Sequence, residues 1–419
     1  HVISIEILSS KDNISVTANG IKVHDVIPAK FTGIQVIVLN QANAAKMASS
    51  SNPIALEFDN APFLDGSRLG LPVAVMAGNR PHYLFRMLLS LKNVIGLNVS
   101  MVTIYIDGFF EEPALLGKLF NLKVNQHEPV STRNARISQH YKKSLTTSFE
   151  DNPEAQHLVI LEEDLDLSVD ILSFFKQLLP VLEKDDSLFC ISAWNDQGYK
   201  HSSNDVSMTY RVEYMPGLGW VLPRKIYKNE LEPDWPSPDK MWDWDMWVRA
   251  AKINGRECII PDVSRTYHFG AQGINMNPFF QELYFEGHAL NKEPNVKINS
   301  DIMYKDSYEL EIDRLLRSSS VLNHTKTPCS HPKTFIPDTR NQTYVYYIKM
   351  ENSAKNWINT AHCFKIWDVD VRDNHKNMFR FWARGNHLIV IGCPDSPYCK
   401  YKPSHVINAE VKKPDKNAT

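Results

Sequence analysis

The segment that most constrains the fold is the apolar run 157–161 (His-Leu-Val-Ile-Leu), which breaks directly into four carboxylates: Glu162, Glu163, Asp164 and Asp166. Such a run is typical of a buried strand in a parallel sheet. The carboxyl ends of these strands lie at the edge where open α/β sheets bind ligands. Clustered negative charges call for a cation, which favours a divalent metal carrying a phosphorylated ligand. The alternative is a solvated junction between strand and loop.

Apolar runs and amphipathic stretches alternate from Leu71 to about residue 193. The pattern predicts strands over 71–77, 99–106, 157–161 and 188–193, and helices over 83–91, 114–120, 137–149 and 172–182. This alternation is typical of a parallel or mixed sheet covered by helices. The sequence has no G-x-G-x-x-G fingerprint and no Walker A motif, which argues against a dinucleotide site and a P-loop.

Composition divides the 419 residues into four parts. Residues 1–48 carry alternating segments, 2–7 and 33–40, that predict strands but are too few to close a core alone. Residues 49–70 are rich in Ser, Asn, Pro and Asp and predict a linker. Residues 71–300 then form the main domain. Residues 301–419, with strand-like runs at 343–348 and 387–392, are expected to form a smaller β-containing C-terminal domain with a tail.

The overall composition excludes several classes of protein. The net charge of −2 without a basic run argues against nucleic acid as a partner. No apolar stretch is long enough to span a bilayer, so an anchor is expected upstream of His1. Six cysteines, which allow fifteen pairings, favour the secretory lumen together with five N-x-S/T sequons. These sequons begin at Asn13, Asn98, Asn323, Asn341 and Asn417.

Two further strand ends carry charged residues. Arg80 follows the strand 71–77, and Asp107 follows the strand 99–106. If these strands are neighbours, both residues meet the acidic cluster at one edge of the sheet, an arrangement that suits a nucleoside diphosphate. The alternative for either residue is that it caps a turn.

Residues 241–247 read Met-Trp-Asp-Trp-Asp-Met-Trp, an unusual interleaving of tryptophan and aspartate. The structural interpretation is the start of a core helix, with aspartate as N-cap and tryptophan as packing. The functional interpretation is an acceptor platform, in which Trp242 and Trp244 hold a sugar ring while an aspartate accepts a hydroxyl proton. A carboxylate beside apolar rings has a raised pKa, which helps a base. The segment 268–273 contains glycines and predicts a lid, in which His268 is more simply structural than a metal ligand.

Five motifs carry a resemblance to a known family: 77–81, 161–166, 191–196, 216–220 and 242–247. The order and the residues of these motifs resemble those of the β-1,2-N-acetylglucosaminyltransferases. The resemblance is strongest to the enzymes that act on protein O-linked mannose. The similarity runs from about residue 53 nearly to the C-terminus. It implies a GT-A glycosyltransferase fold, with a Rossmann-like mixed sheet, and an inverting, Mn²⁺-dependent reaction with UDP-GlcNAc. Residues 1–48 resemble only the beginning of the family's lectin-like stem domain.

The resemblance also implies roles for matching residues. Asp164 would coordinate Mn²⁺, and Asp243 would be the general base, with Asp245 as the alternative. Trp242 and Trp244 stay candidates for the acceptor side. The implied disulfides are Cys190–Cys258 and Cys329–Cys363, and Cys393–Cys399 would be an additional one. The residues expected at the nucleotide-sugar site are Arg80, Asp107, His140, Glu162, Glu163 and Trp220.

These implications combine into one expected function. The chain would transfer GlcNAc to the 2-hydroxyl of O-linked mannose on glycoproteins, by a single displacement, as a type II membrane protein of the Golgi lumen. One alternative is an N-glycan mannose as the acceptor. Another is a non-catalytic glycan-binding protein built on a transferase fold, because fold alone does not establish function.

Overall fold

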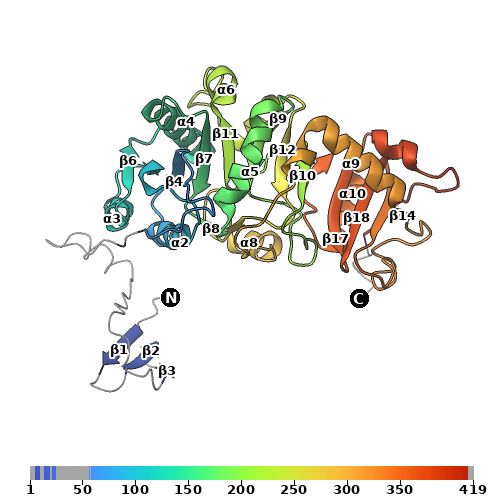
Figure 1. The fold of residues 1–419 in the computed structure, drawn as a ribbon, viewed down its shortest axis with the longest axis horizontal. Coiled ribbons are helices and arrows are strands. Elements are labelled where there is room, and N and C mark those ends of the chain that lie inside the picture. Colours follow the sequence, from blue (N-terminus) through green and yellow to red (C-terminus); the bar gives the residue numbers. More distant parts are fainter. Residues whose placement is uncertain (1–4, 10–13, 19–20, 25–55, 57, 414–419) are drawn as a thin grey trace.

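The computed structural model describes residues 5–9, 14–18, 21–24, 56 and 58–413. Its centre is an eight-stranded sheet with the strand order β10-β12-β9-β11-β7-β4-β5-β6 (Figure 1). The strands β7, β4, β5 and β6 run parallel to one another, whereas β11 is antiparallel to both of its neighbours. The strands are β4 (Val73–Ala77), β5 (Val102–Asp107), β6 (Lys123–His127), β7 (His157–Glu162), β9 (Leu188–Ser192), β10 (Thr209–Val212), β11 (Trp220–Pro223) and β12 (Glu257–Pro261).

Helices cover both faces of this sheet. Side chains on one face pack with α2, α3 and α5, and those on the other face pack with α4 and α7. Strand β4 illustrates the division, because Val73 and Val75 belong to the first core whereas Ala74 and Met76 belong to the second. The helices are α2 (Pro81–Leu91), α3 (Glu111–Leu119), α4 (Arg133–Asp151), α5 (Ile171–Lys184), α6 (Arg224–Ile226), α7 (Trp244–Ala251) and α8 (Pro278–Tyr284). A separate two-stranded antiparallel sheet of β8 (Leu165–Leu167) and β13 (Thr266–His268) lies beside α2.

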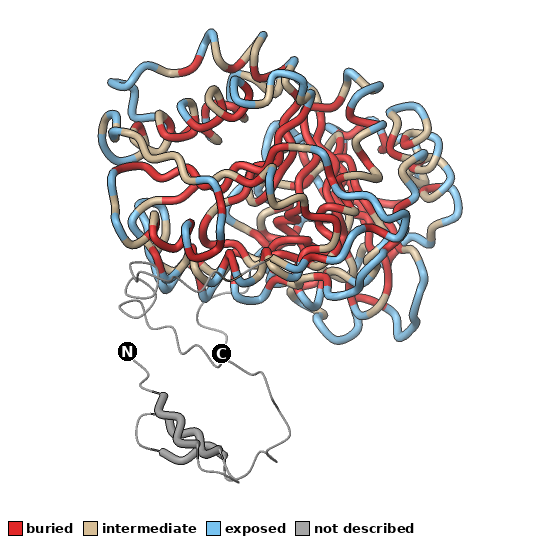
Figure 2. The backbone as a smooth tube through the Cα atoms, turned by 60° about the vertical axis from the view of Figure 1, so that its left-hand side comes forward, coloured by how far each residue is buried: buried red, intermediate tan, exposed pale blue. Residues whose placement is uncertain are grey.

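A second sheet forms the C-terminal region, with the order β14-β15-β18-β17-β16. The helix α9 (Lys305–Ser318) joins the two regions, because its buried face and part of the second sheet belong to the same core as α5. Figure 2 shows the resulting pattern, with buried residues in the interior and exposed residues around the periphery. The elements are β14 (Ser320–Val321), β15 (Thr343–Met350), α10 (Lys355–Phe364), β16 (Asn374–His375), β17 (Met378–Ala383) and β18 (Asn386–Pro394).

The described structure confirms the expected mixed α/β sheet with covering helices and the additional β-containing region after residue 300. The polar strand β6 was not predicted, because it lies at the sheet edge and lacks an apolar alternation. Near the N-terminus, β1 (Ile5–Ser9), β2 (Ile14–Ala18) and β3 (Ile21–His24) form an antiparallel sheet. The strand predicted over 33–40 lies outside the described residues, and the stem, linker and domain boundaries stay predictions.

Three disulfide bonds are present: Cys190–Cys258, Cys329–Cys363 and Cys393–Cys399. The first joins neighbouring parallel strands, since Cys190 of β9 lies opposite Cys258 of β12. The two pairings that the family resemblance implied, Cys190–Cys258 and Cys329–Cys363, are confirmed, and so is the additional pairing Cys393–Cys399. Among the described residues, no helix has the length and apolar character needed to cross a lipid bilayer.

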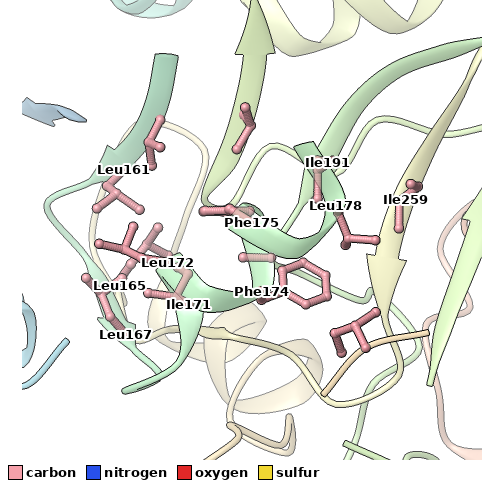
Figure 3. Packing of buried hydrophobic residues seen from close by; sticks show 14 of the residues in the cluster. Leu161, Leu165, Leu167, Ile171, Leu172, Phe174, Phe175, Leu178, Ile191 and Ile259 are labelled. Carbon is pink, nitrogen blue, oxygen red and sulfur yellow. The ribbon is translucent and has the colours of Figure 1, made fainter. Parts of the chain in front are cut away.

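The helix α5 is the clearest case of burial driving the fold. Its apolar side chains recur at helical spacing and face the sheet, where Phe175 and Leu178 meet Ile191 and Ile259 of the strands (Figure 3). The phenyl ring of Phe175 is fully buried, with 0% of its surface exposed. Leu161, which precedes the acidic cluster in β7, belongs to the same buried cluster as the side chains of α5. The packing of α5 therefore supports the strand that carries the acidic cluster.

Phe175→Ala is expected to lower the free energy of unfolding by about 3–5 kcal/mol, because the change removes buried apolar surface and leaves a cavity. Urea denaturation followed by tryptophan fluorescence would measure it. The matched control is Phe279→Ala on α8, where 72% of the side chain is exposed. That variant should stay within about 0.5 kcal/mol of the parent. Equal destabilisation by both variants would contradict the assignment of α5 to the core.

Candidate active site

The charged strand ends meet at one edge of the large sheet. Strand β4 pairs in parallel with both β5 and β7, so the carboxyl ends of the three strands lie side by side. These ends carry Arg80 after β4, Asp107 at the end of β5 and Glu162 at the end of β7. The adjacency required by the prediction is therefore present, at the sheet edge where α/β proteins bind ligands.

Arg80 holds the acidic cluster together. Its Nε donates to Oε1 of Glu163 at 2.6 Å, and its Nη1 lies 3.0 Å from Oδ2 of Asp164. Burial raises the pKa of Glu163 to about 7, and the nearby Arg80 limits that rise. The two carboxylates in turn raise the pKa of Arg80, although burial of its guanidinium opposes this change. The result is a fixed cation surrounded by carboxylates.

Asp164 is the member of this cluster best suited to a metal. It is buried, and its Oδ1 has no hydrogen-bond partner among the described residues. Burial opposes its charge, but His268, whose Nε2 lies 3.6 Å from Oδ2, and Arg80 outweigh burial and hold the pKa of Asp164 at about 2. An ionised, buried oxygen without a partner is costly unless a cation binds it. Asp164 therefore fits a divalent cation.

Glu162 contacts helix α4, which packs on the other face of the sheet from α2, α3 and α5. The hydroxyl of Tyr141 on α4 donates to its Oε1 at 2.5 Å. Burial, followed by the charge of Asp164, raises the pKa of Glu162 to about 8. Burial and the charge of Asp164 thus favour the neutral form of this carboxyl group. The helix α4 brings Tyr141 to the acidic cluster and carries His140 beside it in the sequence.

A second group of polar side chains lies at the ends of β5 and β6. Nε2 of His127 lies 2.8 Å from Nδ1 of His140, and Arg136 donates from Nε to Oδ2 of Asp107 at 2.6 Å. Burial, with His127 and Arg136 as further causes, lowers the pKa of His140 to about 3, so its ring is neutral. Two buried atoms have no partner among the described residues, Oδ1 of Asp107 and Nε2 of His140.

The ligand atoms of Asp107, His127 and His140 lie within 4.8 Å of one another, close enough to hold a metal ion. Two features favour a different ligand. Arg136 already places a cation against Asp107, and one nitrogen of each ring is used in the contact between the histidines. What remains free is a carboxylate oxygen beside a neutral ring nitrogen, a pair that can recognise the edge of a planar polar ring.

Asp243 lies at the start of α7, but its side chain does not cap the helix. Instead, Nδ2 of Asn275 donates to its Oδ2 at 2.5 Å. Burial, followed by the charge of Asp245, raises the pKa of Asp243 to about 6, and the bond from Asn275 limits the rise. Asp245 forms an ion pair with Arg249 at 2.7 Å. Of the two aspartates, Asp243 therefore has the properties of a base.

The tryptophans of this segment have different places. Trp244 is buried and stacks between Tyr141, at 4.3 Å, and Trp220, at 5.5 Å between ring centroids. Trp242 is about half exposed and lines a cavity of about 170 Å³ together with Asp243. The remaining lining residues are Asn134, Met241, Met246 and Ala250. Trp242 thus faces a space that can receive a ligand, whereas Trp244 and Trp220 form the support behind it.

The segment 269–277 between β13 and α8 covers the acidic cluster. Nη1 of Arg80 donates to the carbonyl of Gln272 at 2.9 Å, and the amide of Ala271 donates to the hydroxyl of Tyr83 at 3.1 Å. A Cβ at Gly270 would overlap the carboxylate of Asp164, so only glycine allows this close approach. The predicted lid therefore lies directly over the candidate metal ligand, and its Asn275 reaches Asp243.

Several side chains at this site were not predicted: His127, Arg136, Tyr141 and Asn275. Arg136 precedes His140 by four residues, so helical spacing alone could have placed the two on one face of α4. The other three gave no signal that sequence reasoning could use. Their roles depend on strand β6, on the orientation of α4 against the sheet and on the path of the segment 269–277.

A model of the GNT-I family matches residues 119–357, more than half of the chain. The α-1,3-mannosyl-glycoprotein 2-β-N-acetylglucosaminyltransferase of Arabidopsis thaliana is 32% identical over 233 residues. This similarity covers 52% of the present chain and 51% of the relative, so the chain spans about half the length of the relative it matches.

Solved structures are similar only at a distance. A fragment of TarS from S. aureus, residues 1–349, has 11% identity and a TM-score of 0.35, covering 47% of this chain and 60% of that fragment. The mannosyltransferase PcManGT from Pyrobaculum calidifontis, in complex with GDP-Man and Mn²⁺, has 12% identity and a TM-score of 0.32, covering 66% and 67%. Similarity at this level is too weak to indicate a shared ligand. The match over residues 119–357 is decisive by contrast, and it shows that the chain belongs to the GNT-I family.

Proposed function

We propose that this chain is an inverting glycosyltransferase that moves GlcNAc from UDP-GlcNAc to the 2-hydroxyl of a mannose on a glycoprotein. The observation that carries the proposal is the arrangement at one sheet edge. A buried, ionised Asp164 with a free oxygen lies under the same lid segment that reaches Asp243, a carboxylate with a pKa of about 6 beside a cavity. Membership of the GNT-I family and the name of the Arabidopsis thaliana relative support the choice of donor and linkage.

The group around Asp107 and His140 suits the base of the donor. A uracil edge presents an N–H donor flanked by carbonyl acceptors. Oδ1 of Asp107 can accept from the N–H, and the neutral ring of His140 can present an N–H to a carbonyl in one of its tautomers. The lack of other partners for these atoms supports their assignment to a base of this kind.

Arg80 and Asp164 suit the diphosphate of the donor. Arg80 offers the planar cation that pairs well with phosphate oxygens. Asp164 would hold Mn²⁺ through its free carboxylate oxygen. When bound, this cation offsets the negative charge of the departing diphosphate. A phosphate oxygen that pairs with Nη1 of Arg80 would replace the carbonyl of Gln272 there, so we propose that the lid moves as the donor enters.

Asp243 would act as the general base. Its carboxylate accepts the proton of the mannose 2-hydroxyl as that oxygen attacks C1 of GlcNAc from the face opposite the leaving diphosphate. The C1–oxygen bond to UDP breaks as the new bond forms, which inverts the α-linked donor to a β-linked product. Trp242 lines the cavity in which the acceptor would lie, and the stacked Trp244 fixes the start of α7.

This assignment predicts the pH dependence of turnover. Since the base must be ionised, kcat/KM should rise with pH through about 6, the pKa of Asp243. The bond from Asn275 lowers that pKa, so Asn275→Ala should move the acidic limb of the profile to higher pH. The control is Gln272→Ala, which keeps the main-chain carbonyl that Arg80 uses and should leave the midpoint unchanged. An acidic limb that does not move in Asn275→Ala would contradict the assignment.

Two acceptors carry a suitable mannose. The five motifs together resemble most closely the enzymes acting on O-linked mannose, and the N-glycan enzymes resemble the chain less well around Asp243, so O-linked mannose is the acceptor we propose. The name of the Arabidopsis thaliana relative, an enzyme of α-1,3-mannosyl-glycoprotein, favours an N-glycan mannose as the second candidate.

The purified chain should therefore be incubated with UDP-GlcNAc and Mn²⁺ and offered a mannosyl-threonine peptide or a free trimannosyl core. Mass spectrometry and linkage analysis would identify the product. A β-1,2-linked GlcNAc that is lost with EDTA is expected on the peptide. Product on the trimannosyl core alone would identify the N-glycan candidate as correct. Tight UDP binding without transfer to either acceptor would contradict the proposal and favour a non-catalytic glycan-binding protein.

The three disulfide bonds support an oxidising compartment for the chain. We propose that this compartment is the Golgi lumen, where a transferase of glycoprotein glycans would meet its acceptors.

A further inference from the structure

A second cavity lies in the C-terminal region, apart from the candidate active site. Its volume is about 620 Å³, within the range of roughly 300–1,000 Å³ typical of ligand pockets. Its walls come from residues 200–204, the loop 328–340 before β15, the end of α10, and the turn from β17 to β18. It shares no lining residue with the donor site or with the cavity beside Asp243.

Covalent and hydrogen bonds hold these walls in place. The disulfide Cys329–Cys363 joins the loop 328–340 to α10, and both segments line the cavity. Nε2 of His201 contacts the carbonyl of Phe364 at 2.9 Å, and the amide of Trp382 donates to the carbonyl of Ser202 at 2.8 Å. A cavity fixed in this way is preformed, so a ligand would not have to order its walls on binding.

The charge of the lining is predominantly positive. Lys200, Arg340 and Arg384 line the cavity together with His201, against the single carboxylate of Asp338. Arg384 lies 3.8 Å from Asp338, a long contact to a fully exposed carboxylate. Within residues 58–413, neither Lys200 nor Arg340 has a carboxylate inside 4.0 Å. Two cations at one cavity without an acidic partner favour an anionic ligand.

Aromatic rings occupy the same cavity. Phe364 and Trp382 are partly exposed and line it above the buried Phe335 and Phe381. Nε1 of Trp382 is a buried donor without a partner among the described residues. Partly exposed ring faces can pack against the C–H face of a sugar. A small inorganic anion would not contact the aromatic rings and would fill only part of the cavity.

From these observations we propose that this cavity binds an acidic saccharide, one that carries a sulfate, phosphate or carboxylate group. The cations would pair with the acidic group while Phe364 and Trp382 contact the sugar ring. The choice of a saccharide over other anionic ligands rests on the proposed function, because a transferase of glycoprotein glycans works among such chains. The cavity would then be a second glycan contact, separate from catalysis.

Binding should be measured by isothermal titration calorimetry on the full chain without donor. The probes are a fully sulfated heparin disaccharide, its non-sulfated uronate counterpart, neutral chitobiose, inorganic sulfate and a hexaglutamate peptide. The sulfated disaccharide is expected to bind most tightly and chitobiose most weakly. No binding of either acidic disaccharide would overturn the proposal, as would inorganic sulfate or the peptide binding as tightly as the sulfated disaccharide.

Lys200→Ala/Arg340→Ala should raise the Kd of the sulfated disaccharide by roughly tenfold or more, since two charge-assisted contacts are lost. The matched control is Lys297→Ala/Arg314→Ala, which removes the same charges from exposed positions outside the cavity and should leave Kd unchanged. An unchanged Kd in the first variant would overturn the assignment. Turnover of UDP-GlcNAc, measured separately, should be unaffected by both variants, so failure of the cavity proposal and failure of the proposed function are distinguishable.

Discussion

Asp243→Asn is expected to reduce kcat by about 10²- to 10⁴-fold, the contribution that a positioned general base typically makes. The change keeps the size of the side chain and can keep the contact with Asn275, but an amide is far too weak a base to take the hydroxyl proton. Affinity for UDP should stay the same, because Asp243 lies beside the small cavity rather than among the groups assigned to the diphosphate. Single-turnover kinetics together with UDP titration would separate the two effects.

The matched control is Asp245→Asn, two residues further along the same helix. Asp245 pairs with Arg249, so its loss should change kcat only slightly through local packing and through the pKa of its neighbour. Because the charge of Asp245 is one cause of the raised pKa of Asp243, the acidic limb should move to lower pH in this variant. Normal turnover by Asp243→Asn, or a greater loss in Asp245→Asn, would show that the base has been assigned to the wrong carboxylate.

Asp164→Ala is expected to abolish the gain in UDP affinity that Mn²⁺ provides, a loss of roughly 10²-fold or more, because the cation offsets several kcal/mol of diphosphate charge. Titrations of UDP with Mn²⁺ and with EDTA should then give the same Kd. The fold should persist, since the change removes a buried carboxylate and leaves Arg80 bound to Glu163.

Asp166→Ala provides the comparison, because it removes a carboxylate from the same segment. Asp166 pairs with the exposed Arg86, a contact worth about 0–1 kcal/mol. Its loss should leave Mn²⁺-dependent UDP binding within about threefold of the parent. If Asp164→Ala keeps the gain in UDP affinity that Mn²⁺ provides and Asp166→Ala loses it, the metal ligand is Asp166 rather than Asp164.

Much of the architecture could be predicted from local pattern. The strands β4, β5, β7 and β9 and the helices α2 to α5 lie close to the predicted positions, because apolar periodicity reports directly which faces a segment must bury. The antiparallel strand β11 within the sheet was missed. Its four residues, Trp220–Pro223, are all buried and show no alternation, so no local signal distinguishes them from other core segments.

The sequence by itself determined which chemical groups are available: the four carboxylates at and directly after the end of β7, Arg80, Asp107 and the Trp-Asp segment. It also indicated that strand ends bring the first three together, since parallel neighbouring strands share one functional edge. The tertiary structure alone decided how these groups differ. Asp164 has a lowered pKa and a free oxygen, whereas Glu162 and Asp243 have raised pKa values, because each depends on burial and on partners such as His268, Tyr141 and Asn275 that are distant in sequence. Desolvation and contacts between remote residues set protonation, and neither is encoded in local sequence pattern.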